Sequence, residues 1–251
     1  MAHELFNVIN SKKGRGGLMA IKIDMEKAFD RMEWDFILVI LNKLGFHPSW
    51  INWIRICITT PTFSILINGS PFGKFSPQRG LRQGDPLSPF LFILGTEVIS
   101  RLLLRQETRD LKGIKIARNC APISHLLFAD DLILFAKATS VEANALKSCM
   151  DLYSQWSGQT INYSKSSIHF SKNTAPSTIT SISEIFPFKR ASISSKYLGL
   201  PLYLAKLNLQ HLVIFWEKSP GRLMDGEQRL YLRLGARCSL SLWQLLFLLM
   251  Q

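Results

Sequence analysis

The stretch Phe128-Ala129-Asp130-Asp131 decides the fold, because it lies between two short and almost purely apolar runs, Ile123–Phe128 and Leu132–Ala136. These runs predict two strands of a hairpin, with the two aspartates at the turn between them. Adjacent carboxylates at the tip of a buried hairpin repel each other and need a neutralising cation. The simpler alternative is a turn built from turn-favouring residues.

A third carboxylate lies upstream, at the end of another apolar run. Residues 18–25 predict a buried strand that ends at Asp24, and this strand should lie beside the hairpin of Asp130 and Asp131. Three carboxylates at one sheet edge could hold two Mg²⁺ ions about 4 Å apart, the arrangement used for in-line phosphoryl transfer. Mn²⁺ has similar oxygen preferences.

The rest of the chain predicts alternating helices and strands, so the fold class is α+β, an antiparallel sheet with helices on one face. A capping box, Thr139 with Glu142, should start one helix, which Gly158 should end. The Asn68-Gly69 pair should form a hairpin turn. The other expected helices cover residues 34–44, 90–104 and a segment from Pro48, and the other expected strands cover 63–67, 72–75, 166–170 and 197–203.

The composition indicates a globular chain with a polyanionic partner. It has 251 residues, and 30 Lys and Arg against 18 Asp and Glu give a net charge of +12. Nucleic acid is the usual partner for such an excess, although a merely soluble basic protein is the alternative. The four cysteines form no C-x-x-C pair, no signal peptide is evident, and the longest apolar run, Leu240–Met250, is too short to span a bilayer. We therefore expect an intracellular protein, nuclear or cytoplasmic, without a membrane partner; no protein partner can be inferred.

Five ordered segments resemble the motifs of reverse transcriptases. They are Lys22–Asp30 for motif A, Gly80–Pro89 for motif B, Phe128–Asp131 for motif C, Gly158 through Asn162 to Lys165 for motif D, and Lys196–Gly199 for motif E. The resemblance covers roughly residues 2–218. The sequences of Phe128–Asp131 and Met25–Trp34 are similar to those of plant non-LTR (LINE-type) retrotransposons. This resemblance implies a polymerase palm with partial fingers and the start of a thumb.

The resemblance implies an RNA-directed DNA polymerase that extends a DNA primer on an RNA template with deoxynucleoside triphosphates. Asp24 and Asp130 would be the principal ligands of two Mg²⁺ ions, with Asp131 nearby. The primer 3′-hydroxyl would attack the α-phosphate and release pyrophosphate, to which Lys165 could donate a proton. An exposed lysine is otherwise a solvated charge.

Other matched positions carry nucleotide and primer roles in the family. Phe29 matches the steric gate that excludes a 2′-hydroxyl, although it could also be a core aromatic residue. Motif B implies nucleotide contacts, and motif E implies a primer grip. The motif B residues are Arg82, Gln83 and Gly84, and the primer-grip residues are Tyr197, Leu198 and Gly199.

The chain departs from the family at both ends. The chain begins with Met1–Leu5 just before motif A, so we expect a truncated copy that lacks the triphosphate-binding residues of the upstream fingers. Two rivals therefore remain beside a polymerase: a non-catalytic nucleic-acid-binding remnant of a transposon, and a remnant without function.

The family likeness ends near Lys218, which divides the chain into a reverse transcriptase domain, 1–218, and an atypical tail, 219–251. Two segments typical of related elements, encoded with suitable codons and read one base later, reproduce Gly226–Arg233 and Leu242–Met250. We interpret the tail as an out-of-frame translation that was not selected to pack.

Overall fold

The centre of the fold is strand β1, Leu18–Ile23, whose side chains are buried on both faces except at Lys22. The computed structural model describes residues 1–117, 119–191, 196–197 and 200–201. Burial on both faces explains why this strand is a nearly continuous apolar run instead of an alternating one. The tail, 219–251, and its boundary near residue 218 lie outside the described residues.

Five strands form the main sheet in the order β4-β5-β1-β6-β7. All neighbouring pairs are antiparallel except β6 with β7, which are parallel. The hairpin predicted around the two aspartates therefore lies directly against β1, as expected. The bounds of the added strands are β4 His125–Phe128, β5 Asp131–Lys137, β6 Ser167–Phe170 and β7 Lys189–Arg190.

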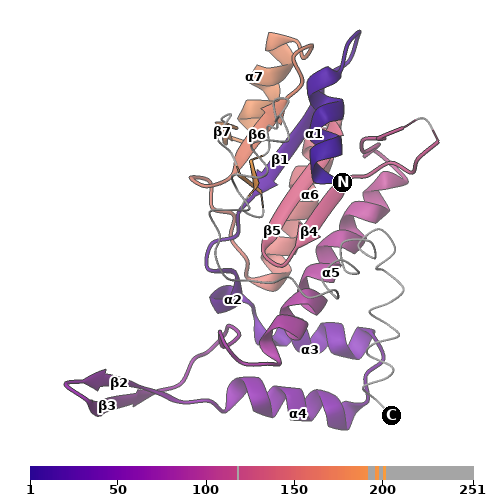
Figure 1. Ribbon diagram of the computed structural model, residues 1–251. Helices are drawn as coiled ribbons and strands as arrows, with labels where there is room; N and C mark the ends of the chain where they lie inside the picture. The colour runs from indigo at the N-terminus through magenta and orange to yellow at the C-terminus, as the bar shows by residue number, and fades with distance from the viewer. Residues whose placement is uncertain (118, 192–195, 198–199, 202–251) are drawn as a thin grey trace, which may run out of the picture. The chain divides into compact units, whose positions relative to one another are not determined.

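Three helices cover one face of this sheet: α5, Ser88–Glu107, α6, Ser140–Ser157, and α7, Pro176–Ile185. They pack on every second residue of β1 and β5, in one core that includes Met19, Ile21 and Leu134. Helix α1, Ala2–Ser11, which the sequence analysis did not predict, covers part of the other face (Figure 1). It packs there on Ala20, Ile133 and Phe135.

The capping box predicted at the start of α6 forms only in part. The Thr139 hydroxyl accepts a hydrogen bond from the Glu142 N–H at 3.3 Å, as expected. The Glu142 carboxylate, however, accepts from the backbone N–H groups of Lys137 and Lys112, at 3.0 and 3.3 Å, and not from that of Thr139. Glu142 therefore ties α6 to two other segments, and burial raises the pKa of its carboxyl.

A second lobe follows the short helix α2, Ala28–Arg31. Helices α3, Trp34–Lys43, and α4, Pro48–Thr59, pack on α5 and share an apolar core with α2. Beyond α4, strands β2, Phe63–Ile67, and β3, Ser70–Phe75, form a two-stranded ribbon that projects from the rest of the fold (Figure 1). The Asn68–Gly69 turn joins them, as predicted.

Two predicted segments differ from the structure. Helix α5 is longer than expected, because it starts before the predicted 90–104 and ends after it. Within the predicted strand 197–203, the described residues form two strands of two residues each, β8, Lys196–Tyr197, and β9, Leu200–Pro201. They pair with each other in antiparallel fashion, so the chain reverses direction here instead of continuing as one strand.

Candidate catalytic carboxylate site

Asp24 immediately follows β1 and is fixed by its backbone on both sides. Its N–H donates to the Ser166 hydroxyl at 3.1 Å, and its carbonyl oxygen accepts from the Asn162 N–H at 2.8 Å. Both partners belong to the segment that precedes β6, far from Asp24 in the sequence. Because the main chain of Asp24 is held in this way, its half-buried side chain has a defined position at the end of the sheet.

The hairpin β4–β5 closes with Phe128 paired to Asp131, so its two turn residues are Ala129 and Asp130. Asp131 is the first residue of β5, and not a turn residue as the sequence analysis expected. Ala129 has a φ of 52°, a left-handed conformation that is costly for a residue with a Cβ. The expectation of a buried tip is wrong for Asp130, which is exposed, whereas Asp131 is half-buried.

The strand register brings Asp24 and Asp131 to the same end and the same face of the sheet. Lys22 is paired with Ile133 and Ile23 with Leu132. Because side chains alternate along a strand, Lys22, Asp24 and Asp131 all point to one face. In agreement, the Lys22 ammonium forms an ion pair with Asp131, with Nζ 3.6 Å from Oδ1. The sequence analysis did not single out Lys22 as a functional residue.

The surrounding charges act on the carboxyl of Asp24. Partial burial raises its pKa, the lysines Lys165 and Lys22 lower it, and the neighbouring carboxylates of Asp130 and Asp131 raise it. The net effect is an upward shift of the pKa. The three carboxylates of motifs A and C and the lysine of motif D are therefore close enough to interact electrostatically.

The donor set suits a hard cation such as Mg²⁺, because three carboxylates supply oxygen ligands of negative charge. Among the residues that the structure describes, however, no three His, Cys, Asp or Glu side chains are gathered as ligands around one point. The convergence of the three carboxyl groups on a single point stays a prediction. In the present arrangement Lys22 supplies the positive charge beside Asp131.

Lys165 is held beside this group by a turn in motif D. The Asn162 side-chain oxygen accepts hydrogen bonds from the Ser164 N–H at 3.1 Å, the Ser164 hydroxyl at 2.7 Å and the Lys165 N–H at 3.3 Å. An Asn side chain that bonds to the main chain ahead of it stabilises a turn in this way. Since Asn162 is also bonded to the Asp24 carbonyl, motif D is attached to motif A.

Motif B lies against the short helix α2, in which motif A ends. The Gly80 N–H donates to the Met32 carbonyl oxygen and the Leu81 N–H to that of Phe29, both at 2.8 Å. Gly80 has a φ of 90°, and a Cβ placed there would come within 2.6 Å of the Asp30 carbonyl oxygen. Only glycine fits both the conformation and the close approach at this position.

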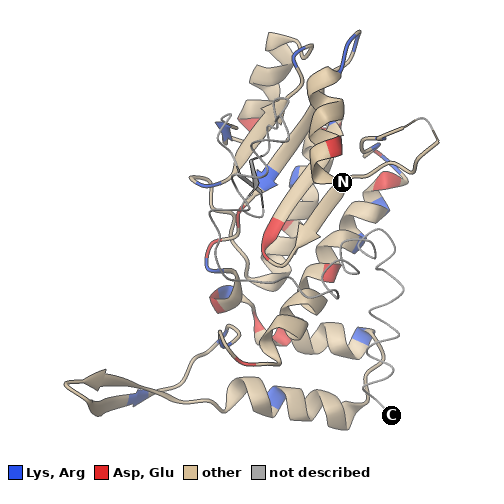
Figure 2. Ribbon diagram, in the orientation of Figure 1, with Lys and Arg blue, Asp and Glu red and all other residues tan. Residues whose placement is uncertain are grey.

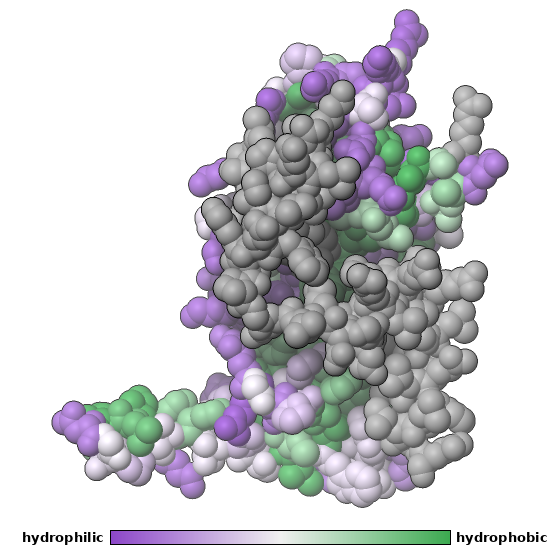
Figure 3. Space-filling model, in the orientation of Figure 1, coloured by the Kyte–Doolittle hydropathy of each residue, from purple (hydrophilic) through white to green (hydrophobic). Residues whose placement is uncertain are grey.

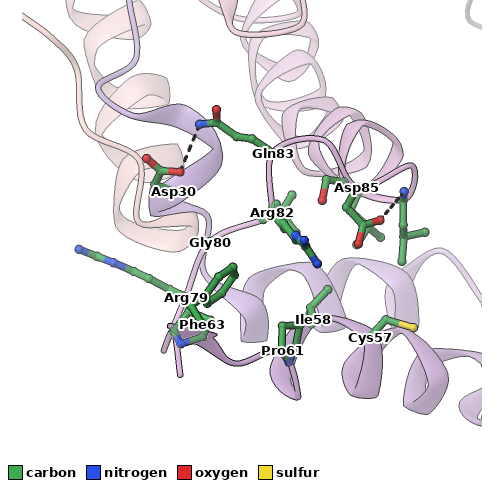
Figure 4. A pocket seen from close by; sticks show the side chains of 15 residues that line it. Asp30, Cys57, Ile58, Pro61, Phe63, Arg79, Gly80, Arg82, Gln83 and Asp85 are labelled. Atoms are coloured by element: carbon green, nitrogen blue, oxygen red, sulfur yellow. Dashed lines mark hydrogen bonds between the residues drawn. The ribbon is translucent and has the colours of Figure 1, made fainter. Parts of the chain in front are cut away.

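Two of the predicted nucleotide-contact residues, Arg82 and Gln83, line a pocket of about 440 Å³ between motif B, α4 and the base of the ribbon (Figure 4). The Arg82 guanidinium lies over the ring of Phe63, 5.9 Å from its centroid. The Gln83 amide donates to Asp30 Oδ1 at 3.4 Å. Arg82, Gln83 and the adjoining Gly84 are all exposed, and Gly84 is not among the pocket residues.

Phe29 is half-buried and stacks on Phe92 of α5, with ring centroids 4.4 Å apart and an interplanar angle of 11°. This contact fits a core aromatic residue, and the remaining exposed part of the ring leaves the gate hypothesis open. In motif E, the main chain of Tyr197 belongs to β8, while Leu198 and Gly199 lie outside the described residues.

A carboxylate after a central strand, beside a hairpin with two more carboxylates and backed by helices, is the arrangement of a polymerase palm. The chain belongs to the reverse transcriptase (RNA-dependent DNA polymerase) family, whose profile matches residues 3–202. The assignment that the five motifs indicated is therefore confirmed.

The relatives come from plants and from transposable elements of animals. An uncharacterized mitochondrial protein of Arabidopsis thaliana is 61% identical over 67 residues, 26% of this chain and 55% of that protein. The transposon TX1 149 kDa protein of Xenopus laevis is 30% identical over 60% of this chain and 11% of its own length. A Pol polyprotein of the retrotransposable element R2 from Popillia japonica is 36% identical over 45% and 16%, respectively.

This chain thus spans about half of the plant protein and at most about a sixth of the two transposon proteins. Among solved structures, apo telomerase from Candida tropicalis matches with a TM-score of 0.51 over 69% of this chain and 35% of that one. At 16% identity this likeness concerns the fold, and it agrees with the α+β palm expected from the sequence. In the part of the chain that the structure describes, no helix has the length and apolarity to cross a membrane.

Proposed function

We propose that this chain provides the palm of an RNA-directed DNA polymerase of a non-LTR retrotransposon. The observation that carries the proposal is the register of β1 and β5, which brings Asp24 and Asp131 to one end of the sheet beside the turn residue Asp130. Family membership supports the same activity. The substrates would be an RNA template, a DNA primer and deoxynucleoside triphosphates.

In this proposal Asp24 and Asp130 are the principal ligands of two divalent ions, Mg²⁺ or Mn²⁺, and Asp131 lies nearby. When bound, the ions activate the primer 3′-hydroxyl and neutralise the leaving phosphates. Lys165, whose charge acts on Asp24, would give a proton to the departing pyrophosphate. Lys22 limits the repulsion between the carboxylates while no nucleotide is bound.

The nucleotide would approach from the side of motif B. Phe29, which is half-buried and stacked on Phe92, would exclude a 2′-hydroxyl with the exposed part of its ring. Arg82 offers a cation to phosphate, and Gln83 and Gly84 lie on the same exposed loop. The primer grip would be residues 197–199.

A primer-extension assay tests the proposal, with an RNA template, a DNA primer and Mg²⁺ or Mn²⁺. The assay should compare this chain and a version with a complete fingers region, each with its Asp130→Asn variant. Extension that depends on Asp130 supports the proposal. If neither version extends the primer although both are folded and bind the duplex, the chain is not a polymerase.

One observation favours a second candidate, nucleic-acid binding without catalysis. The second lobe and motif B contain no Asp or Glu between Asp35 and Asp85, a stretch in which Figure 2 shows blue but no red segments. Filter binding to RNA at several salt concentrations tests it, because contacts with phosphate weaken steeply as salt rises. The cations in this stretch are Lys43, Arg55, Lys74, Arg79 and Arg82.

A further inference from the structure

A small cavity of about 10 Å³, partly open to solvent, lies beneath the turn that carries Asp130. The turn residues Ala129 and Asp130 form part of its wall, together with Tyr153 of α6 and Gln159 of motif D. Most of the remaining wall is apolar. A volume of about 10–15 Å³ is what one water molecule requires, provided that polar partners surround it.

Two of the side chains in the wall have polar atoms without a partner. Gln159 Oε1 is buried and has no hydrogen bond among the described residues. The Tyr153 hydroxyl is also buried and forms no hydrogen bond of good geometry there, although the Ser157 side chain lies near it and acts on its pKa; the two residues are 3% and 1% exposed. Buried polar atoms nearly always have a partner in folded proteins. Because the two residues line one cavity, a polar occupant there could satisfy both atoms.

The chemistry of the two groups is complementary. The Gln159 amide nitrogen donates to the Ala28 carbonyl oxygen at 2.7 Å, which fixes the amide so that its oxygen is the free acceptor. Burial raises the pKa of Tyr153, so its hydroxyl keeps its proton and is a donor. Ser157, near this hydroxyl, already donates its own proton to the Tyr153 carbonyl oxygen at 2.6 Å.

The turn above the cavity needs support. Ala129 is in the left-handed region, and the hairpin has only two residues beyond the pair Phe128 and Asp131. Gln159 already joins motif D to motif A through its bond to Ala28. A polar bridge from Gln159 to the turn would connect motif C to the same residue.

We propose that this cavity holds one water molecule, which accepts a hydrogen bond from Tyr153, donates one to Gln159 and supports the Ala129–Asp130 turn. Tyr153 and Gln159 are then positioning residues that hold Asp130 ready for a metal ion. The role of Asp130 as a ligand rests on the proposed function, whereas the water site itself does not.

A high-resolution crystal structure of the whole chain tests the water site. We expect a water molecule within hydrogen-bond distance of both the Tyr153 hydroxyl and Gln159 Oε1, and its loss in Tyr153→Phe. An empty cavity, or a direct bond between the two side chains, would overturn the inference.

Titration with Mn²⁺, followed by the loss of the free-ion spin-resonance signal, tests the positioning role. Tyr153→Phe and Gln159→Met should each weaken Mn²⁺ binding by about tenfold, the lower range for groups that support metal ligands. Because both act through one water, the double variant should also lose about tenfold and not about a hundredfold. Gln155 lies at an exposed position of α6, the helix that carries Tyr153, and the control variant Gln155→Met should bind Mn²⁺ like the unchanged chain.

The outcomes separate this inference from the proposed function. A roughly hundredfold loss of Mn²⁺ affinity in the double variant would contradict the positioning role. Unchanged Mn²⁺ affinity in both single variants would contradict it as well. If Asp130→Asn leaves Mn²⁺ binding intact while the crystal structure contains the water, the catalytic metal site is wrong and the water site stands.

Discussion

Two hairpins of this protein have similar local sequences and opposite surroundings. Both β4–β5 and β2–β3 consist of two strands joined by two turn residues, although β3 contains Ser70, Gly73 and Lys74 while β5 is apolar from Leu132 to Ala136. The strands of the first are packed between α6 and α1, and Phe135 in β5 is fully buried. In the ribbon β2–β3, Leu66 is 71% and Phe72 is 70% exposed, and Figure 3 shows this apolar surface in green on the projecting ribbon.

The comparison shows that a two-residue turn between strands specifies a hairpin but not its burial. Burial comes from partners distant in the sequence, β1 and the helices for the first hairpin. The exposed hairpin has the more favourable turn, and the buried hairpin the less favourable one. The ribbon has the favourable pair Asn68-Gly69, while the hairpin with the carboxylates has Ala129 in a left-handed conformation. The less favourable turn therefore lies at the candidate site, as strained backbone often does.

The largest expected effect is the loss of activity when the carboxylate turn is changed. In a version that extends a primer, Asp130→Asn should reduce the rate by more than about 10²-fold, because even groups that only support metal ligands contribute 10- to 100-fold. Asn68→Asp, the reverse exchange at the ribbon turn, is the matched control and should leave the rate unchanged. Equal effects of the two variants would contradict the distinction between the hairpins.

The next effect is on stability and compares two phenylalanines. Phe135→Ala should lower the free energy of unfolding by about 3–5 kcal/mol, because it leaves a cavity in a buried core. Phe72→Ala should lower it by less than about 0.5 kcal/mol, because the ring is mostly exposed. Urea denaturation measures both. A large loss for Phe72→Ala would mean that the ribbon is covered in solution, for example by another copy of the chain.

A smaller effect concerns the two turns. Ala129→Gly should raise the free energy of unfolding by up to about 1 kcal/mol, since glycine adopts a positive φ without the steric cost that alanine has. Gly69→Ala should lower it by about 1 kcal/mol, because Gly69 has a φ of 82°. Urea denaturation of both variants under one condition shows whether each free energy of unfolding rises or falls. A destabilised Ala129→Gly variant would show that the alanine methyl group makes a packing contact worth more than the strain.

These contrasts explain which parts of the molecule the sequence could predict. The strand before Asp24, both hairpins and helix α6 were predicted because their signals are local: apolar runs, turn residues and caps. Helix α1 was missed although it carries a local signal, because Leu5, Phe6 and Ile9 lie on one helix face and are buried. The parallel pairing of β7 and the reversal between β8 and β9 were not predicted, because these two-residue segments are too short for a local pattern.

The site shows the same division. The carboxylates and Lys165 were found from motifs, which do not depend on knowing the contacts. The ion pair of Lys22 with Asp131 depends on strand register, and the hydrogen bonds that join Asp24 to Ser166 and Asn162 connect segments about 140 residues apart in the chain. No spacing in the sequence indicates such contacts, so Lys22 and Ser166 were missed.

The smallest expected effect is the pH dependence that Asp24 contributes. Burial and the neighbouring carboxylates raise the pKa of its carboxyl above the ordinary value of 3.8, so the folded chain binds this proton more tightly than the unfolded chain does. The protonated Asp24 carboxyl therefore contributes stability that is fully present below the pKa it has in the unfolded chain. This contribution is lost as the pH rises through the pKa it has in the folded chain. At neutral pH the ionised group therefore costs stability, and Asp24→Asn should melt at a slightly higher temperature than the unchanged chain.

Melting curves of the unchanged chain and of Asp24→Asn should be measured from pH 3 upward. Their melting temperatures should diverge only as the pH passes the ordinary pKa of an aspartate, about 3.8–3.9. The gap should be the smallest of the four effects, because Asp24 is only half-buried and its charge interactions are screened by water. Mg²⁺ gives the comparison a second control. Under the proposed function it binds the folded chain through Asp24, so it should raise the melting temperature of the unchanged chain and not that of Asp24→Asn. If Asp24→Asn melts at a lower temperature at neutral pH, the carboxylate stabilises the sheet end, and the charge balance inferred for this site is wrong.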